Sequence, residues 1–391
     1  GVAGVDDQIG YYAGLLGSCF YAPLFVMNIA WGLASDRVGR KPVLLLGVLV
    51  GGCASLMLSL SSHFWVPFAA RLLAGLFGAN STVTKGHLGA LMPDEVERSW
   101  AYGIYGSVYG IMGIVGPLLG SLLTDPARRY PGAVAADGFL AHHPFFLPII
   151  TTTALHVAGF VLITRRFEGP KLASAFRALA GRERPLARPP PTSPQATLRA
   201  IREDHSPAGA RASRGGLSWA TVRAALTPAV LRAIGLYCSI ALVNMLWTII
   251  LPLYFSTAAV DGGLGLRASQ ASLPLAALMA AKFLVQFFGS VHIVAPLGSR
   301  ATFIVGMLLV GPVLLALGLL HTLPAGAGRW LALLSCMMLL GVAEAMCYLS
   351  VILQITMSVP SASQLGLVHG IATSAAAMVR TIAPAAGGAM W

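Results

Sequence analysis

The sequence predicts an all-α polytopic membrane protein, and three properties of its 391 residues indicate that class. Only 10% of the residues are charged, whereas about 25% are charged in an ordinary soluble protein. Hydrophobic residues make up 56% of the chain, and the mean hydropathy is +0.76. The runs 42–60 and 303–320 carry no charge and match the ~20 residues that cross a bilayer. This composition excludes a soluble enzyme and a nucleic-acid-binding domain.

Ten apolar segments can be marked, and one polar loop divides them five and five. The predicted organisation is an N-terminal lobe at 1–164, a loop at 165–228 and a C-terminal lobe at 229–391. The loop is rich in arginine and proline and poor in aromatic residues, so we expect it to be disordered. The ten segments are 9–35, 42–61, 64–92, 100–124, 144–164, 229–255, 268–297, 302–320, 330–357 and 365–391.

The net charge of +12 is concentrated around that loop. Residues 165–232 hold thirteen basic and four acidic side chains, an excess of nine. Cytoplasmic loops of membrane proteins are enriched in Lys and Arg, so this loop is predicted to be cytoplasmic. Counting spans back from it places the turn at 36–41 inside and the loop at 125–143 outside. Because few aromatic residues are interleaved with the basic ones, nucleic-acid binding is not expected.

No motif for a metal, a disulfide framework or ATP occurs in the chain. There is no Cys-x-x-Cys, no Cys/His cluster and no G-x-x-x-x-G-K-[ST] pattern. The cysteines lie in apolar segments and are interpreted as small hydrophobic residues. We therefore expect no cofactor, no metal site and no direct use of ATP. The five cysteines are Cys19, Cys53, Cys238, Cys336 and Cys347.

The turn at 36–41 joins the first two apolar segments. Gly39 allows a positive φ, Asp36 can accept hydrogen bonds from Arg or from a helix N-terminus, and Pro42 suits the first turn of a helix. By itself the pattern is also that of a basic cytoplasmic loop closed by a glycine.

The sequence at 32–41, Gly-Leu-Ala-Ser-Asp-Arg-Val-Gly-Arg-Lys, resembles the G-x-L-a-D-r-x-G-R-[KR] signature of the major facilitator superfamily. That resemblance implies two six-helix lobes. The signature lies between helices 2 and 3 of the family, so the ten visible helices correspond to helices 2–11, and helices 1 and 12 are missing. The second-half counterpart is reduced to Gly298-Ser299-Arg300. The residues implied as a gate latch are Gly32, Asp36, Arg37, Gly39, Arg40 and Lys41.

Two further motifs resemble the same family. Arg71 with Gly75 resembles the R-x-x-x-G motif of the family. Because a charge inside an apolar helix is costly, we expect Arg71 either to face a cavity or to snorkel to the outer membrane interface. The fifth helix resembles the antiporter motif G-x8-G-x3-G-P-x2-G-G, with Met112 and Ser121 at two glycine positions. That motif favours export by exchange, and ordinary glycine-mediated packing is the alternative. Its matching residues are Gly103, Gly116, Pro117 and Gly120.

Other segments resemble those of one branch of the superfamily. This branch comprises the drug:proton antiporters and zinc-induced-facilitator-like exporters of plants and fungi, and it is related to the tetracycline-resistance proteins. The segments are residues 10–20 before Trp31, Asn80 with Lys85, and residues 380–384 beginning at Arg380. The chain has Ala90 where this branch commonly carries an acidic residue. Lys85 is expected to pair locally with Asp94 or Glu95.

Four charges inside the spans are candidates for mechanism: Arg71, Lys282, Glu344 and Arg380. Glu344 is the only carboxylate deep within a predicted span. Such a carboxylate can load and release a proton, or it can form a structural ion pair with Lys282 or Arg380. The sequence leaves these two alternatives open.

These observations predict a secondary active transporter that works by alternating access. We expect proton-coupled export of small organic solutes or drugs by a monomer in the bilayer of the plasma or vacuolar membrane. The predicted partners are a small-molecule substrate, protons and lipid, without nucleic acid. The alternatives are a facilitator or symporter for nutrient uptake, a non-transporting membrane receptor, and an incomplete gene model.

Overall fold

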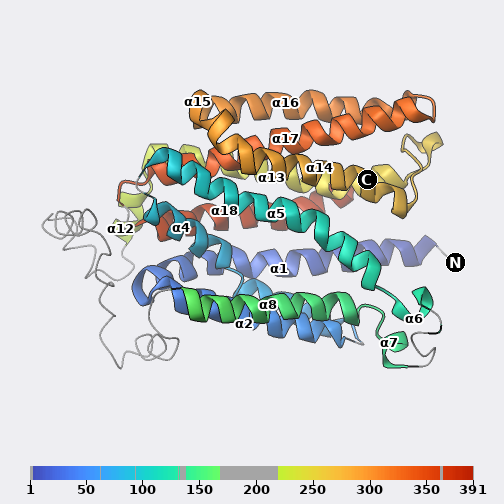
Figure 1. Cartoon of the computed structure of the whole chain (residues 1–391), viewed down its shortest axis with the longest axis horizontal. Coiled ribbons are helices and arrows are strands. Elements are labelled where there is room, and N and C mark those ends of the chain that lie inside the picture. The colour runs from blue at the N-terminus through green and yellow to red at the C-terminus, as the bar shows by residue number, and fades with distance from the viewer. Residues whose placement is uncertain are drawn as a thin grey trace, which may run out of the picture.

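The computed structural model describes residues 3–61, 63–92, 94–130, 132, 138–167, 219–361 and 364–390. Every regular element in these ranges is a helix (Figure 1), which confirms the predicted all-α class. The long helices are α1 (Ala3–Val38), α2 (Arg40–Ser59), α3 (Trp65–Leu76), α4 (Asn80–Leu91), α5 (Glu95–Leu123), α8 (Phe146–Arg166), α13 (Pro228–Ser256), α14 (Ala268–Gly289), α16 (Ser299–Leu319), α17 (Ala327–Ser358) and α18 (Leu365–Met390).

Shorter helices connect the long ones. They are α6 (Pro126–Arg129), α7 (Phe139–His142), α12 (Trp219–Ala225), the turns η1 (Ala259–Asp261) and η3 (Leu320–Thr322), the π-helical turn η2 (Ser290–Val294) and α15 (Ala295–Leu297). Most of the loop expected to be disordered falls at 168–218, outside the described residues, while α12 forms near its end.

Nine of the described helices are long and apolar enough to cross a membrane, and each coincides with an expected segment. The tenth expected span, 64–92, is instead divided into α3 and α4, each of 12 residues. At the break, the indole Nε1 of Trp31 donates a hydrogen bond to the carbonyl of Leu76 at 2.7 Å. Backbone groups in a bilayer must find partners within the protein, so this bond stabilises the interruption.

The helices form an N-terminal half (α1 to α8) and a C-terminal half (α12 to α18), which meet along two main helix pairs. These pairs are α1 with α18 and α5 with α14; α1 and α18 lie side by side in the middle of the bundle (Figure 1). Within the C-terminal half, α17 packs against α13, α14 and α16. Of the residues in the most apolar part of α17, 72% are buried, against 6% in the peripheral α8. The core therefore centres on α17.

We call the end of the bundle that carries the 36–41 turn the Asp36 end. Two glycines begin the helices there. Gly39, before α2, has φ 98° and ψ 156°, and Gly298, before α16, has φ 78° and ψ 153°. Residues other than glycine rarely adopt such positive φ values. The turn geometry predicted for Gly39 is thus present, and its reduced counterpart in the C-terminal half repeats it.

A row of glycines lets α5 approach α14 closely. The spacing of Gly103, Gly106, Gly110 and Gly113 places them on one helical face. A Cβ built on Gly110 would lie 2.9 Å from the Cα of Phe283, and one on Gly103 would lie 2.5 Å from the carbonyl oxygen of Gln286. The backbones of the two helices are therefore in direct contact.

The antiporter-like residues divide along α5. Gly103 belongs to the tight contact with α14. Gly116 and Gly120 do not, because no described heavy atom lies within 4 Å of a Cβ built on either; Pro117 is exposed. The α5/α14 pair is thus tight toward the Asp36 end and separated at the opposite end.

Gly110→Ala is expected to lower the stability of the purified protein by about 1–3 kcal/mol, because the added methyl overpacks the contact with Phe283. Gly116→Ala, on the same helix, is the matched control and should be neutral or slightly stabilising, since alanine favours helix. Thermal melting in detergent measures both, and equal melting temperatures for the two variants would contradict the packing account.

Candidate functional site

At the Asp36 end, the two halves touch through the first turn of α18. A Cβ built on Gly32 would lie 2.6 Å from the carbonyl oxygen of Gly366, and one on Gly370 would lie 2.9 Å from that of Asn28. A Cβ on Gly366 would lie 2.5 Å from the Asp36 Oδ1. The Asp36 carboxylate therefore lies beside the N-terminus of a helix from the other half, where a negative charge is favoured.

Two basic residues of the same turn make contacts inside the N-terminal half. Arg40 Nη1 lies 2.7 Å from His87 Nδ1 on α4. Lys41 Nζ donates to the carbonyl oxygens of Thr164 at 2.9 Å and Phe167 at 2.6 Å, at the end of α8. A cation at a helix C-terminus satisfies free carbonyls and the helix dipole. The Arg37 side chain lies outside the described part of the structure.

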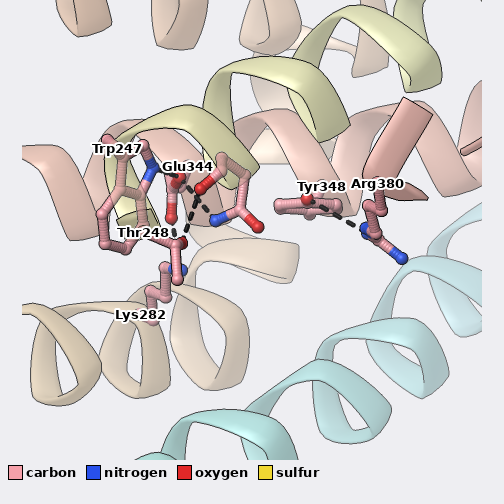
Figure 2. Close-up of polar contacts among 7 residues, drawn as sticks. Trp247, Thr248, Lys282, Glu344, Tyr348 and Arg380 are labelled. Carbon is pink, nitrogen blue, oxygen red and sulfur yellow. Dashed lines mark hydrogen bonds and ion pairs between the residues drawn. The ribbon is translucent and has the colours of Figure 1, made fainter. Parts of the chain in front are cut away.

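Glu344 lies at the centre of a buried polar cluster, the Glu344 cluster, formed with Asn244, Trp247 and Lys282 (Figure 2). Its Oε1 accepts hydrogen bonds from Asn244 Nδ2, at 2.9 Å, and from Trp247 Nε1. Its Oε2 forms an ion pair with Lys282 Nζ. Glu344 is 0% exposed and Lys282 is 4% exposed. The pairing of Glu344 is with Lys282 and not with Arg380.

The Glu344 cluster also reaches the other half of the protein. The ammonium group of Lys282 lies 5.3 Å from the Trp247 ring centroid and 6.0 Å from that of Tyr109 on α5. Both distances suit cation–π attraction, which is stronger away from water. Tyr109 therefore links the ion pair of the C-terminal half to the α5/α14 interface.

A second set, the tyrosine cluster, consists of the buried Lys85 and Tyr237 and the partly buried Tyr348 and Arg380. Lys85 Nζ lies 3.3 Å from the Tyr237 hydroxyl, the rings of Tyr237 and Tyr348 meet edge to face at 6.2 Å, and Arg380 Nη2 donates to the Tyr348 hydroxyl at 3.4 Å. Figure 2 shows Tyr348 and Arg380 beside the Glu344 cluster. The expectation that Lys85 pairs with Asp94 or Glu95 is wrong; Lys85 is buried and contacts the other half.

Neutral hydrogen bonds join the halves near these clusters. Thr82 Oγ1 lies 2.7 Å from Thr373 Oγ1 on α18, and the Tyr102 hydroxyl lies 2.9 Å from Thr356 Oγ1 on α17. Within the N-terminal half, Thr82 Oγ1 also donates to Asn28 Oδ1 at 2.9 Å, and the Tyr102 hydroxyl donates to the Lys85 carbonyl oxygen at 2.9 Å. Buried hydrogen bonds of this kind fix the register of neighbouring helices.

Comparison with known proteins fits this architecture. The family model described as Major Facilitator Superfamily matches residues 7–262, more than half of the chain. The chain belongs to the major facilitator superfamily. It is thus an integral, multi-pass membrane carrier and not an enzyme, and its superfamily carries small-molecule substrates.

Several relatives of this major facilitator protein are plant and fungal carriers. Protein ZINC INDUCED FACILITATOR 1 of Arabidopsis thaliana is 26% identical over 400 residues, covering 100% of this chain and 77% of the relative. Protein ZINC INDUCED FACILITATOR-LIKE 1 of the same plant is 32% identical over 161 residues, 41% of this chain and 33% of the relative. The multidrug transporter mfsB of Aspergillus fumigatus is 29% identical over 157 residues, 40% of this chain and 26% of the relative.

Solved structures share the major facilitator fold. The proton:xylose symporter XylE superposes with a TM-score of 0.72 at 14% identity, covering 100% of this chain and 80% of that one. The human organic anion transporter MFSD10 gives a TM-score of 0.59 at 20% identity, covering 97% of this chain and 78% of that one. At these identities the likeness concerns the fold alone.

Arg71 stands apart from both clusters of this major facilitator protein. Its side chain is exposed on α3, of which it is the seventh residue. The four candidate charges thus divide three ways: Lys282 and Glu344 form an ion pair, Arg380 joins the tyrosine cluster, and Arg71 lies on the surface. The sequence analysis did not select Tyr237 and Tyr348 as candidate site residues. The available signal was their position in apolar spans, because a buried tyrosine hydroxyl requires a hydrogen-bond partner.

Breaking the Lys282–Glu344 pair should destabilise the protein more than removing it altogether. Glu344→Gln and Lys282→Met are each expected to cost about 3–5 kcal/mol, because each leaves one buried charge or polar group without its partner. The double variant should recover much of that loss. Thermal melting of the four proteins in detergent measures the coupling, and strictly additive losses would show that the two residues do not act as a pair.

Proposed function

We propose that this chain is a secondary active transporter that exports small organic solutes in exchange for protons. The observation that carries the proposal is the position of Glu344, a carboxylate inside a span whose charge is balanced by Lys282. A buried titratable group in a carrier is the usual site of proton loading.

The direction of transport and the type of solute are supported by relatives. Besides the multidrug transporter mfsB, an efflux pump azaK of Aspergillus niger is 30% identical over 157 residues. The class H tetracycline resistance protein of Pasteurella multocida is 29% identical over 131 residues. Because each match covers 40% of this chain or less, export remains a proposal.

Alternating access is supported by the uneven contact between the halves. Asp36 and Gly32 lie against α18 at one end, whereas Gly116 and Gly120 of α5 have no close neighbour on α14 at the other. Rocking of the two halves about the buried clusters would exchange the closed and separated ends. In this proposal the 36–41 turn lies in the cytoplasm, so the cytoplasmic side is the closed one, and the membrane is the plasma or vacuolar membrane.

The proton step acts on the Lys282–Glu344 pair. When a proton binds the Glu344 carboxylate, the ion pair ends and Lys282 keeps its charge beside the rings of Trp247 and Tyr109. Tyr109 belongs to the N-terminal half and Lys282 to the C-terminal half. Protonation therefore changes an attraction that crosses the α5/α14 interface, which is how it would bias the movement of the halves.

Glu344→Gln is expected to abolish proton-coupled flux while leaving solute exchange measurable, because the amide cannot release a proton. The full chain in vesicles with an internal pH-sensitive dye is challenged with anionic, neutral and cationic organic solutes under an imposed pH gradient. Glu97→Gln, at an exposed carboxylate of α5, is the control and should keep the coupling. Retained proton dependence in Glu344→Gln would rule out Glu344 as the coupling residue.

Asp36→Asn should slow transport several-fold without lowering expression or melting temperature. The variant keeps the size of the side chain but loses the charge that lies beside the N-terminus of α18, an interaction of about 0.3–1 kcal/mol. Asp94→Asn, at an exposed residue before α5, is the matched control. Normal initial rates in Asp36→Asn at equal protein levels would refute a latch at this position.

A further inference from the structure

Two cations within the spans, one from each half, meet the same pair of tyrosines and have no acidic partner among the described residues. Lys85, on α4, is 6% exposed, and Arg380, on α18, is partly buried. Within the part of the chain that the structure describes, their polar side-chain contacts are with tyrosine hydroxyls and no carboxylate pairs with either. Tyr237 and Tyr348, whose rings meet edge to face, connect the two cations.

The tyrosine cluster supplies rings and hydroxyls but no compensating charge. Lys85 Nζ lies 5.4 Å from the Tyr237 ring centroid and 5.9 Å from that of Tyr105 on α5. Arg380 interacts electrostatically with both Tyr237 and Tyr348. Cation–π attraction and neutral hydroxyls soften the cost of burying a cation, but they do not cancel its charge.

No carboxylate of the described spans is available to cancel the positive charge of Lys85 and Arg380. Glu344, which is the one described carboxylate away from a span end, is held by Lys282, Trp247 and Asn244. Uncompensated charge inside a membrane protein is expensive and marks a functional site. An arriving anion would offset the cost of placing these two positive charges inside the protein.

We propose that Lys85 and Arg380 form a binding site for an organic carboxylate with an aromatic body. The planar guanidinium of Arg380 suits a two-point contact with a carboxylate, and the Lys85 ammonium supplies a compact second charge. The partly exposed rings of Tyr105 and Tyr348 offer stacking surface for the body of the ligand, whereas Tyr237 is buried and holds Lys85 in place.

The site is built from both halves. Lys85 and Tyr105 come from the N-terminal half, and Tyr237, Tyr348 and Arg380 come from the C-terminal half. A carboxylate held between them changes the attraction between the halves, so binding and movement are linked. This inference rests on the proposed function, because it names the chemical class of the solute that the carrier moves.

Binding of matched probes to the purified full chain tests the site. Naphthoate is expected to raise the melting temperature, whereas naphthamide, with the same rings and no charge, and naphthylmethylamine, a cation, should not. Arg380→Gln and Lys85→Gln should each weaken naphthoate binding about 10-fold or more, as expected for a lost charge-assisted hydrogen bond. Arg232→Gln, at an exposed arginine of α13, is the matched control and should bind normally.

A second measurement separates a ligand site from a structural one. Without ligand, Lys85→Met and Arg380→Met should melt at the same temperature as the unchanged protein or higher, because each removes an uncompensated charge. A large loss of stability in both would show that the cations hold the fold together and would overturn the proposal. So would equal stabilisation by naphthoate and naphthamide, or stabilisation by chloride with no preference for naphthoate.

The same preparation distinguishes this inference from the proposed function. If neutral or cationic solutes move with protons while naphthoate neither binds nor moves, the anion site is wrong and the proton-coupled exporter stands. If naphthoate binds through Lys85 and Arg380 and crosses the membrane without any proton movement, the anion site stands and the coupling to protons is wrong.

Discussion

The backbones of α1 and α18 come close together because glycine occupies Gly32, Gly366 and Gly370, and α5 meets α14 in the same way at Gly103 and Gly110. Lipid tails are as apolar as leucine, so helices in a bilayer associate through close packing and polar contacts rather than through a hydrophobic driving force. Inter-half hydrogen bonds such as Thr82–Thr373 and Tyr102–Thr356 form beside these close approaches. A side chain larger than glycine at these positions would overpack the contact between the halves.

Two polar clusters of opposite character lie within the packed helices. In the Glu344 cluster the charges cancel, and Asn244 and Trp247 fill the remaining hydrogen-bonding capacity of one carboxylate oxygen. In the tyrosine cluster two positive charges share neutral hydroxyls. In the proposed mechanism the first arrangement changes when a proton binds Glu344, whereas the second is completed when an anion binds.

The fold class followed from the sequence because hydropathy and charge act locally along the chain. The turn at Gly39 was also predictable, since a positive φ is a property of one residue. The break between α3 and α4 was not, because it depends on a hydrogen bond from Trp31, 45 positions away. Nor did the sequence show that Lys85 meets Tyr237, since such contacts arise from helix packing. The glycine spacing along α5 was a readable signal for one interface, and it extends beyond the antiporter-like motif.

The difference in charge between the clusters also bears on the membrane potential. Moving one elementary charge across 100 mV involves about 2.3 kcal/mol. The Lys282–Glu344 pair is neutral and is indifferent to the field when it moves as a unit. Lys85 and Arg380 together carry two positive charges, so any displacement of an empty tyrosine cluster along the membrane normal is electrically biased. In the proposed mechanism a bound anion removes part of that bias, so the membrane voltage would join the proton and solute gradients in setting how readily the empty carrier returns.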